Sequence, residues 1–144
     1  MFSKACEYGI RAILYIVGRS DEEERSRIKE IAKEIDAPEA FTAKVLQKLV
    51  RKKLLRSITG PRGGFYLNPE DMESIRLIDI VKAIDGDGVF EGCGLGLPHC
   101  DGRHPCPVHH EFKKVKRELE EMLSRMNVKE MADSVEREDT FLKY

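Results

Sequence analysis

The sequence lacks any uninterrupted apolar run near 18 residues, the length that a membrane-spanning helix requires. Its first helix-like stretch carries Lys4, Glu7 and Arg11, and the small-residue cleavage site of a secretory signal is missing. We therefore expect a cytoplasmic protein with no membrane partner. Of the 144 residues, 41% are apolar and 35% are charged, which is typical of one soluble domain with an appendage.

Common enzyme motifs are also missing. The sequence contains no nucleophile-triad motif and no Gly-Lys phosphate-binding loop. It has four cysteines, but none of them form the Cys-x-x-Cys pair that a thiol oxidoreductase would use. These absences argue against an enzyme.

Positive charge is balanced by negative charge over the whole chain but is unopposed in one segment. The net charge is −1, yet residues 44–62 contain no acidic residue. The basic residues of this segment are Lys44, Lys48, Arg51, Lys52, Lys53, Arg56 and Arg62. Such a distribution is typical of a surface that binds nucleic acid, although a solvated helix face would have the same composition.

The spacing of apolar residues predicts three helices in the first third of the chain. We expect helices over 2–18, 27–35 and 39–53, with a polar turn over 20–25, Ser26 as an N-cap and a break at Pro38. In the third helix we expect Phe41 to face inward and Thr42, Ala43 and Lys44 to face outward. The second and third helices match a helix-turn-helix, and an ordinary helical hairpin is the alternative.

A β-hairpin is predicted directly after the third helix. Residues 54–58 and 65–67 resemble short strands, and the turn between them is rich in glycine and proline. A hairpin with basic residues in this position is the wing of a winged helix-turn-helix. Arg62, near its tip, could enter a minor groove, where the negative potential is strong.

The second half of the chain divides into a helix, a long loop and another helix. Ser74 is expected to cap a helix over 75–84 that Gly86 closes. Residues 86–108 hold six glycines, three prolines and three cysteines, so no packed element is expected there. Residues 127–144 are mostly polar and are expected to fray.

The helix predicted over 108–126 carries an apolar stripe at spacings of three and four. Its members are Phe112, Val115, Leu119, Met122 and Met126. This stripe suits a dimer interface, while packing on the helix's own domain is the alternative. The expected organisation is mainly α with a small β-hairpin: a winged helix-turn-helix domain over 1–85, a cysteine-rich loop over 86–108, a long dimerisation helix over 109–130 and a polar tail over 131–144.

The clustered cysteines predict a metal or redox site. Six residues separate Cys93 from Cys100, and five separate Cys100 from Cys106. Structural zinc sites pair ligands two to four residues apart, so the wider gaps favour an iron–sulfur cluster. Zinc and metal-free thiol chemistry are the alternatives. Cys6 lies on an apolar stripe and is expected to be a core thiol.

A fourth ligand would be needed beside the three thiolates. His109, three positions after Cys106, is the local candidate, because imidazole can replace a thiolate ligand. Otherwise His109 would be a solvated histidine at the start of a helix. Glu7 could supply a weak, exchangeable carboxylate. The alternative role of Glu7 is an ion pair with Arg11, which lies four residues further along the same helix.

Several segments together resemble one group of bacterial regulators. They are Ser3-Lys4 with Tyr8–Ala12, Ile28–Ala32, Leu46–Leu49, Gly60–Leu67, Leu77–Val81 and the three-cysteine loop. Over roughly residues 1–126 the chain resembles the IscR/NsrR/CymR class of winged helix-turn-helix regulators, of Rrf type. The Gly-Pro-x-Gly-Gly wing and the cysteine loop together are the specific part of the match.

The resemblance implies a homodimeric regulator that reads a palindromic operator in double-stranded DNA. It also implies a 2Fe–2S or 4Fe–4S cluster that senses oxidants, nitric oxide or cluster supply. Carried onto this chain, the DNA-binding residues are Thr42, Ala43, Lys44, Lys48, Arg51, Arg56 and Arg62.

The cluster ligands that the resemblance implies are Cys93, Cys100 and Cys106, with His109 or the partner subunit's Glu7 as the fourth. The sequence satisfies both patterns for the fourth ligand, so the cluster type stays open. Thr59 stands where some relatives carry Arg, so the operator sequence is not inherited. The rival functions are the same regulator with structural zinc or a thiol switch, and a small electron carrier without DNA binding.

Overall fold

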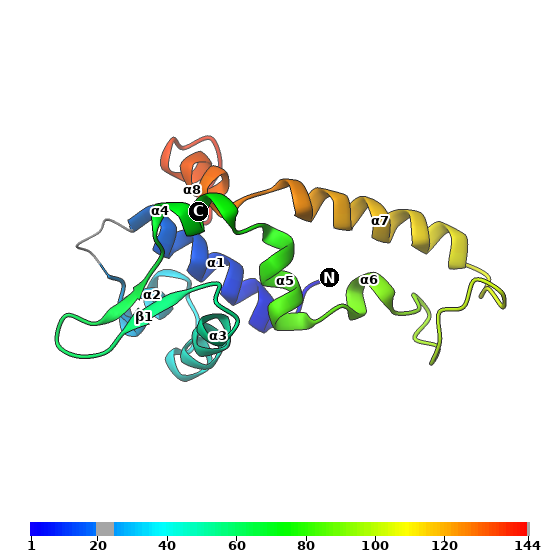
Figure 1. Cartoon of the computed structure of the whole chain (residues 1–144), viewed down its shortest axis with the longest axis horizontal. Coiled ribbons are helices and arrows are strands. Elements are labelled where there is room, and N and C mark those ends of the chain that lie inside the picture. The colour runs from blue at the N-terminus through cyan, green and yellow to red at the C-terminus, as the bar shows by residue number, and fades with distance from the viewer. Residues whose placement is uncertain (20–24, 144) are drawn as a thin grey trace.

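The computed structural model describes residues 1–19 and 25–143 and is mainly helical, with one small hairpin (Figure 1). The predicted turn at 20–25 lies mostly outside the described residues. The elements are α1 (Lys4–Arg19), α2 (Ile28–Glu34), α3 (Glu39–Arg51), β1 (Arg56–Ile58), β2 (Gly64–Tyr66), α4 (Pro69–Ser74), α5 (Leu77–Asp85), α6 (Gly88–Glu91), α7 (His109–Arg125) and α8 (Val128–Glu136). The predicted fold class, mainly helical with a β-hairpin wing, is confirmed.

Helix α1 forms the centre of the core and packs against α3, α5 and α8. Its Ile13 and Ile16 are fully buried, and burial of each such side chain contributes about 1.5–3 kcal/mol. Gly9 lets α5 approach closely, because a Cβ there would lie 2.4 Å from the Ile84 Cδ1. The predicted 2–18 helix is therefore confirmed, and so is the assignment of Cys6 to the core.

The α2–α3 pair is confirmed as two short helices joined by a tight turn. Leu46 and Leu49 anchor α3 in the core. Two of the predicted side-chain directions are wrong. Thr42 is only 1% exposed and its hydroxyl donates to the Pro38 carbonyl over 2.8 Å, whereas Phe41 is 39% exposed and packs edge-on against Tyr8.

Strands β1 and β2 pair in antiparallel register from Arg56–Tyr66 to Ile58–Gly64. The turn between them is tight at Gly63, because a Cβ there would lie 2.3 Å from the Ile58 carbonyl oxygen. Ser26 does not cap α2 as predicted. Its backbone instead pairs with Phe65 through two hydrogen bonds of 3.0 and 2.8 Å, which form an isolated antiparallel bridge to the two-stranded wing.

The segment after the wing contains a helix that the sequence analysis did not predict. Helix α4 begins at Pro69 and ends at Ser74, so Ser74 does not cap the next helix as expected. Helix α5 begins two residues later than predicted, and the Asp79 carboxylate accepts from the Arg76 backbone N–H over 2.8 Å at its start. Gly86 ends α5 with φ 74°, as expected of a closing glycine.

Helix α7 extends away from the body of the molecule and carries the cysteine loop at its far end, opposite the wing (Figure 1). Its predicted bounds are confirmed to within one residue at each end. The expected fraying of residues 127–144 is wrong, because α8 packs on α1 with Val128 and Ala132 buried. No helix in the described residues is long and apolar enough to cross a membrane.

Candidate nucleic-acid interface and cysteine loop

The outer face of α3 presents one polar stripe. Lys44, Gln47 and Arg51 are exposed at spacings of three and four, and Ala43 lies half-buried beside them. Lys48 lies on a different side of the helix. Its ammonium group donates to the Ile84 carbonyl at the end of α5 over 3.0 Å, so this lysine has a structural partner inside the chain.

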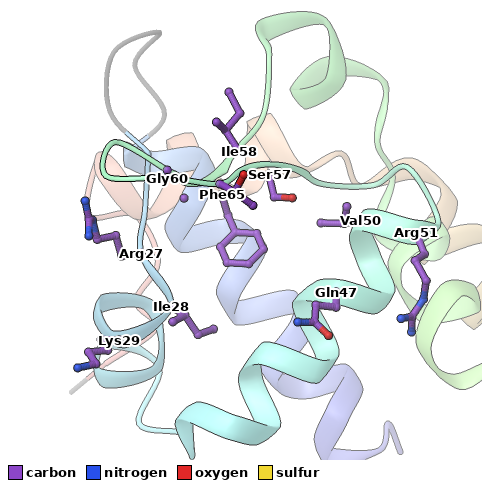
Figure 2. A pocket seen from close by; sticks show the side chains of 13 residues that line it. Arg27, Ile28, Lys29, Gln47, Val50, Arg51, Ser57, Ile58, Gly60 and Phe65 are labelled. Carbon is purple, nitrogen blue, oxygen red and sulfur yellow. The ribbon is translucent and has the colours of Figure 1, made fainter.

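A hollow of about 780 Å³ lies between this stripe, the start of α2 and the wing (Figure 2). Arg27 and Lys29 lie on one side of it, Gln47 and Arg51 on the other, and the Phe65 ring lies between them. Among the described residues that line the hollow, none is acidic. The charge around this concave surface is therefore positive, although the chain as a whole carries a net charge of −1.

The wing is held in place by its neighbours. The Arg25 guanidinium donates to the Arg62 carbonyl over 3.2 Å and stacks on the Tyr66 ring, and Arg27 donates to the Pro61 carbonyl. The side chain of Arg62 is exposed near the hairpin tip. These contacts hold the tip of the hairpin in a fixed position relative to the start of α2.

Arg56, predicted to contact DNA, is partnered at the base of the wing. Its guanidinium binds the Asp71 carboxylate at 2.7 and 3.4 Å. This hydrogen bond from Arg56 holds the pKa of Asp71 below its usual range. The pair ties β1 to α4.

Sequence reasoning missed Arg27, Lys29 and Gln47 as members of this surface. The spacing of Lys44, Gln47 and Arg51 along one helix, three and four residues apart, could have identified Gln47. Arg27 and Lys29 carried no sequence signal of their own. They belong to the surface only because the hairpin folds back over the start of α2.

The cysteine loop places its donors in two close pairs. The Cys93 and Cys106 sulfurs are 3.9 Å apart, and the Cys100 sulfur is 3.5 Å from the His109 Nδ1. His109 is 8% exposed although it opens α7, so it is not the solvated histidine of the alternative interpretation. Four predicted ligands therefore lie on one loop and at the helix end that follows it.

The environment of Cys93 favours its thiolate. The Leu95 backbone N–H donates to the Cys93 sulfur over 3.4 Å, and this bond lowers the pKa of Cys93. The opposite holds in the core, where burial raises the pKa of Cys6 to about 12. The loop thiol is thus suited to bind metal and the core thiol is not.

Glu7 lies apart from these donors in the structure. Its carboxylate pairs with Lys4 at 3.0 Å rather than with Arg11, whose guanidinium donates to the Ile35 carbonyl. Over the described ranges 1–19 and 25–143, no three His, Cys, Asp or Glu side chains gather closely enough to hold a metal ion. The loop has the right donor chemistry for an iron–sulfur cluster. To bind one cluster, the Cys93–Cys106 pair and the Cys100–His109 pair would have to move closer together.

The apolar stripe of α7 is left uncovered along the projecting part of the helix. Val115 is 58% exposed, and Phe112 and Met122 are exposed to about 40% and 39%. Leu123, which the predicted stripe did not include, is fully buried in the core, where α7 packs against α5. Leu119 and Met126, two members of the predicted stripe, are half-buried against the same core. One face of α7 thus packs on its own chain while a second apolar face remains exposed.

Comparison with known proteins gives a consistent result. The family model Rrf2, described as an iron-dependent transcriptional regulator, matches residues 2–134. A putative HTH-type transcriptional regulator of Aquifex aeolicus is 30% identical over 140 residues, which cover 95% of this chain and 94% of the relative. The HTH-type transcriptional regulator NsrR of Oceanobacillus iheyensis is 27% identical and covers 77% of this chain and 75% of its own length.

Solved structures with the same fold include two regulators. CymR, the global cysteine regulator of B. subtilis, has a TM-score of 0.77 at 17% identity and covers 92% of this chain and 96% of its own. IscR of T. potens has a TM-score of 0.74 at 20% identity and covers 97% and 91%. At these identities the likeness establishes the fold.

Proposed function

The chain belongs to the Rrf2 family of transcriptional regulators, and we propose that it is a homodimeric member that senses redox state, nitric oxide or iron–sulfur status through a cysteine-ligated iron–sulfur cluster. The family membership confirms the resemblance found in the sequence. DNA binding follows from membership in a family of transcriptional regulators. The dimer, the operator geometry and the cluster are our proposals.

The observation that carries the DNA-binding part is the acid-free hollow between α3 and the wing. We propose that Lys44, Gln47 and Arg51 meet base edges and phosphates in a major groove, with Arg62 in the adjacent minor groove. Lys29 then lies beside the phosphate backbone between the two grooves, while Arg27, which donates to the Pro61 carbonyl, holds the wing in place. Thr42 is buried and Lys48 and Arg56 are partnered, so they are left out of this contact set.

The DNA face can be tested with two arginine variants of equal charge change. Arg51→Ala should weaken binding to a specific duplex by about 5- to 150-fold, the range for loss of one well-placed contact. Arg117→Ala removes the same charge from an exposed position of α7, away from the hollow, and should leave the affinity unchanged. Equal losses in both variants, measured by fluorescence anisotropy at one salt concentration, would contradict this assignment.

The uncovered stripe on α7 supports the homodimer. A second copy of the same stripe is complementary to it across a two-fold axis, and that symmetry would place two α3 helices on a palindromic site. Val115→Glu places an unpaired charge in the proposed interface and should yield a monomer in sedimentation. Arg117→Glu, on the opposite side of α7, should remain dimeric; a dimeric Val115→Glu variant would count against this interface.

The donors that would hold the cluster are Cys93, Cys100, Cys106 and either His109 or the partner's Glu7. When bound, the cluster supplies an iron centre that oxidants or nitric oxide can modify or remove. The chain's own part is to offer soft thiolates, and the Leu95 N–H favours that form at Cys93. The buried His109 already lies beside the Cys100 sulfur.

Anaerobic reconstitution with iron and sulfide tests the cluster. We expect visible absorption bands that Cys93→Ser, Cys100→Ser and Cys106→Ser each abolish. Mössbauer and paramagnetic resonance spectra of His109→Ala and Glu7→Ala then identify the fourth ligand, since only the true ligand's loss should alter them. A wild-type protein that stays colourless with iron and sulfide present would end the cluster proposal.

A direct route connects the loop with the DNA face. Lys48 of α3 donates to the Ile84 carbonyl, and Ser3 at the start of α1 hydrogen-bonds to the Asp85 carboxylate. Ile84 and Asp85 are the last residues of α5 before Gly86 and the loop. A change in the loop would therefore act first on the helix end that holds α3, and a coupling of about 1–3 kcal/mol would change the affinity for the operator by about 5- to 150-fold.

A further inference from the structure

We propose that, in the cluster-free protein, the Cys93 and Cys106 thiols close an intramolecular disulfide when a peroxide oxidises them, while Cys100 stays reduced. This inference concerns the chain without its cluster and does not depend on a cluster ever having been bound. It goes beyond the proposed function because it assigns different roles to three cysteines that a cluster would treat alike.

The geometry separates the three thiols. The Cys93 and Cys106 sulfurs are in contact at 3.9 Å, although the two positions are 13 apart along the chain. Cys100, which lies between them in sequence, points instead to the His109 ring at 3.5 Å. Two sulfurs in contact need a shift of roughly 2 Å in total to reach disulfide bonding distance.

The backbone around the pair is held from both sides. Lys116 of α7 donates to the Gly92 carbonyl, directly before Cys93. The Cys106 carbonyl accepts from the His109 backbone N–H over 3.0 Å, directly at the start of α7. The backbone next to each cysteine is thus hydrogen-bonded to α7, which keeps the two sulfurs together. The intervening residues 94–105 are exposed or half-buried.

The chemistry balances with hydrogen peroxide as oxidant. Peroxide transfers one oxygen to the first thiol, giving a sulfenic acid and one water. The second sulfur attacks the sulfenic sulfur, the S–S bond forms, and the S–O bond breaks to release a second water. Two thiols and one peroxide yield one disulfide and two waters. Two of the three thiolate ligands are then unavailable to iron until a dithiol reduces the bond.

Chain length alone predicts a different outcome, which makes the proposal testable. Without a fold, the shorter loops Cys93–Cys100 and Cys100–Cys106, with separations of seven and six, close more easily than the separation of 13. The entropy of loop closure favours the shortest over the longest by about threefold. A preference for Cys93–Cys106 therefore has to come from the native structure.

The experiment maps disulfides in full-length protein stripped of iron and treated with stoichiometric peroxide, once in buffer and once in urea. Cleavage after Leu95 and after Arg103 places the three cysteines on separate peptides for mass spectrometry. We expect Cys93–Cys106 to be the main disulfide in buffer and a minor one in urea, with the buried Cys6 reduced in buffer. Cys100→Ser should keep the bond and Cys106→Ser should lose it.

Three results would overturn the proposal. They are a main disulfide through Cys100 in buffer, no intramolecular disulfide in buffer, and the same Cys93–Cys106 preference in urea as in buffer. None of them bears on cluster assembly, which reconstitution of reduced protein measures separately, so failure here and failure of the proposed function are distinguishable.

Discussion

The DNA-binding head and the cysteine loop are organised in opposite ways. In the head, α1, α3 and α5 share a core in which Ile13, Leu46 and Ile80 are fully buried. Between Gly88 and Val108 no side chain of the described structure is buried, and Leu95 and Leu97 are about half exposed. The head is therefore held together by its own packing, whereas the loop has no buried side chains that would do the same.

The difference would allow one small chain to bind DNA with the head and to carry the proposed sensing function in the loop. A rigid head keeps α3 and the wing at a fixed spacing, because the wing is hydrogen-bonded to Ser26 and contacted by Arg25 and Arg27. A loop without its own core can change conformation at little cost to the head. The two regions meet at the end of α5, where Lys48 and Ser3 bind.

The largest expected contrast is in stability. Leu46→Ala should lower the free energy of unfolding by about 2–5 kcal/mol, because it leaves a cavity in the shared core. The matched substitution Leu97→Ala removes the same atoms from an exposed loop position. It should change the free energy of unfolding by less than about 0.5 kcal/mol. Urea unfolding at one protein concentration measures both, and similar losses would mean that the loop has a core of its own.

Thiol reactivity gives the next contrast. Burial raises the pKa of Cys6 to about 12, so at pH 8 its reaction with iodoacetamide should be at least about 100-fold slower than that of Cys100. The rates should converge in urea, which serves as the control. Equal rates in the native protein, followed by mass spectrometry, would show that the head opens as readily as the loop.

Two glycine-to-alanine substitutions, one in the wing and one in α1, test how rigidly the head holds its wing. In Gly63→Ala the new Cβ would lie 2.3 Å from the Ile58 carbonyl, so the hairpin must deform, at about 1–3 kcal/mol, and DNA affinity should fall. Gly18→Ala meets nothing within 4 Å in α1 and should leave DNA affinity as it is. Calorimetry and anisotropy measure both variants; unchanged affinity in Gly63→Ala would separate the wing from DNA recognition.

The smallest effect concerns the base of the wing. Because Arg56 lowers the folded-state pKa of Asp71, their pairing stabilises the fold above the ordinary aspartate pKa of about 3.9 and is lost as pH falls through the lower folded-state value. At pH 7 Asp71→Asn should lower the melting temperature by no more than about 3 °C, since the pair is partly exposed. The two proteins should converge at acidic pH; a difference that grows there would reverse the assigned sign.

Much of the head could be predicted from the sequence because its elements are regular. Apolar spacing located α1, α3, α5 and α7, and the glycine-rich turn located the wing. Short elements were missed. Helix α4 has six residues, and α6 has four, although no packed element was expected over 86–108. Helix α8 was missed because most of its residues are polar, although Val128 and Ala132 on one side of it are buried.

The finer features of the site could not be predicted, because they depend on tertiary contacts. Thr42 looked polar and outward, but its hydroxyl bonds to the Pro38 carbonyl one turn back and its side chain is buried. Ser26 looked like a helix cap, yet the returning hairpin pairs with its backbone. The division of the cysteines into one sulfur pair and one sulfur–imidazole pair likewise has no counterpart in their spacing.

The central claim is that a dimer presents two copies of the α3–wing face to one DNA duplex. Selection from a random duplex pool by the full-length protein, followed by hydroxyl-radical footprinting of the enriched sequence, tests it most directly. The account predicts two inverted half-sites whose protected centres are about 10 base pairs, or a multiple of that, apart. Failure to enrich any sequence at low ionic strength, or enrichment of a single unpaired half-site, would contradict it.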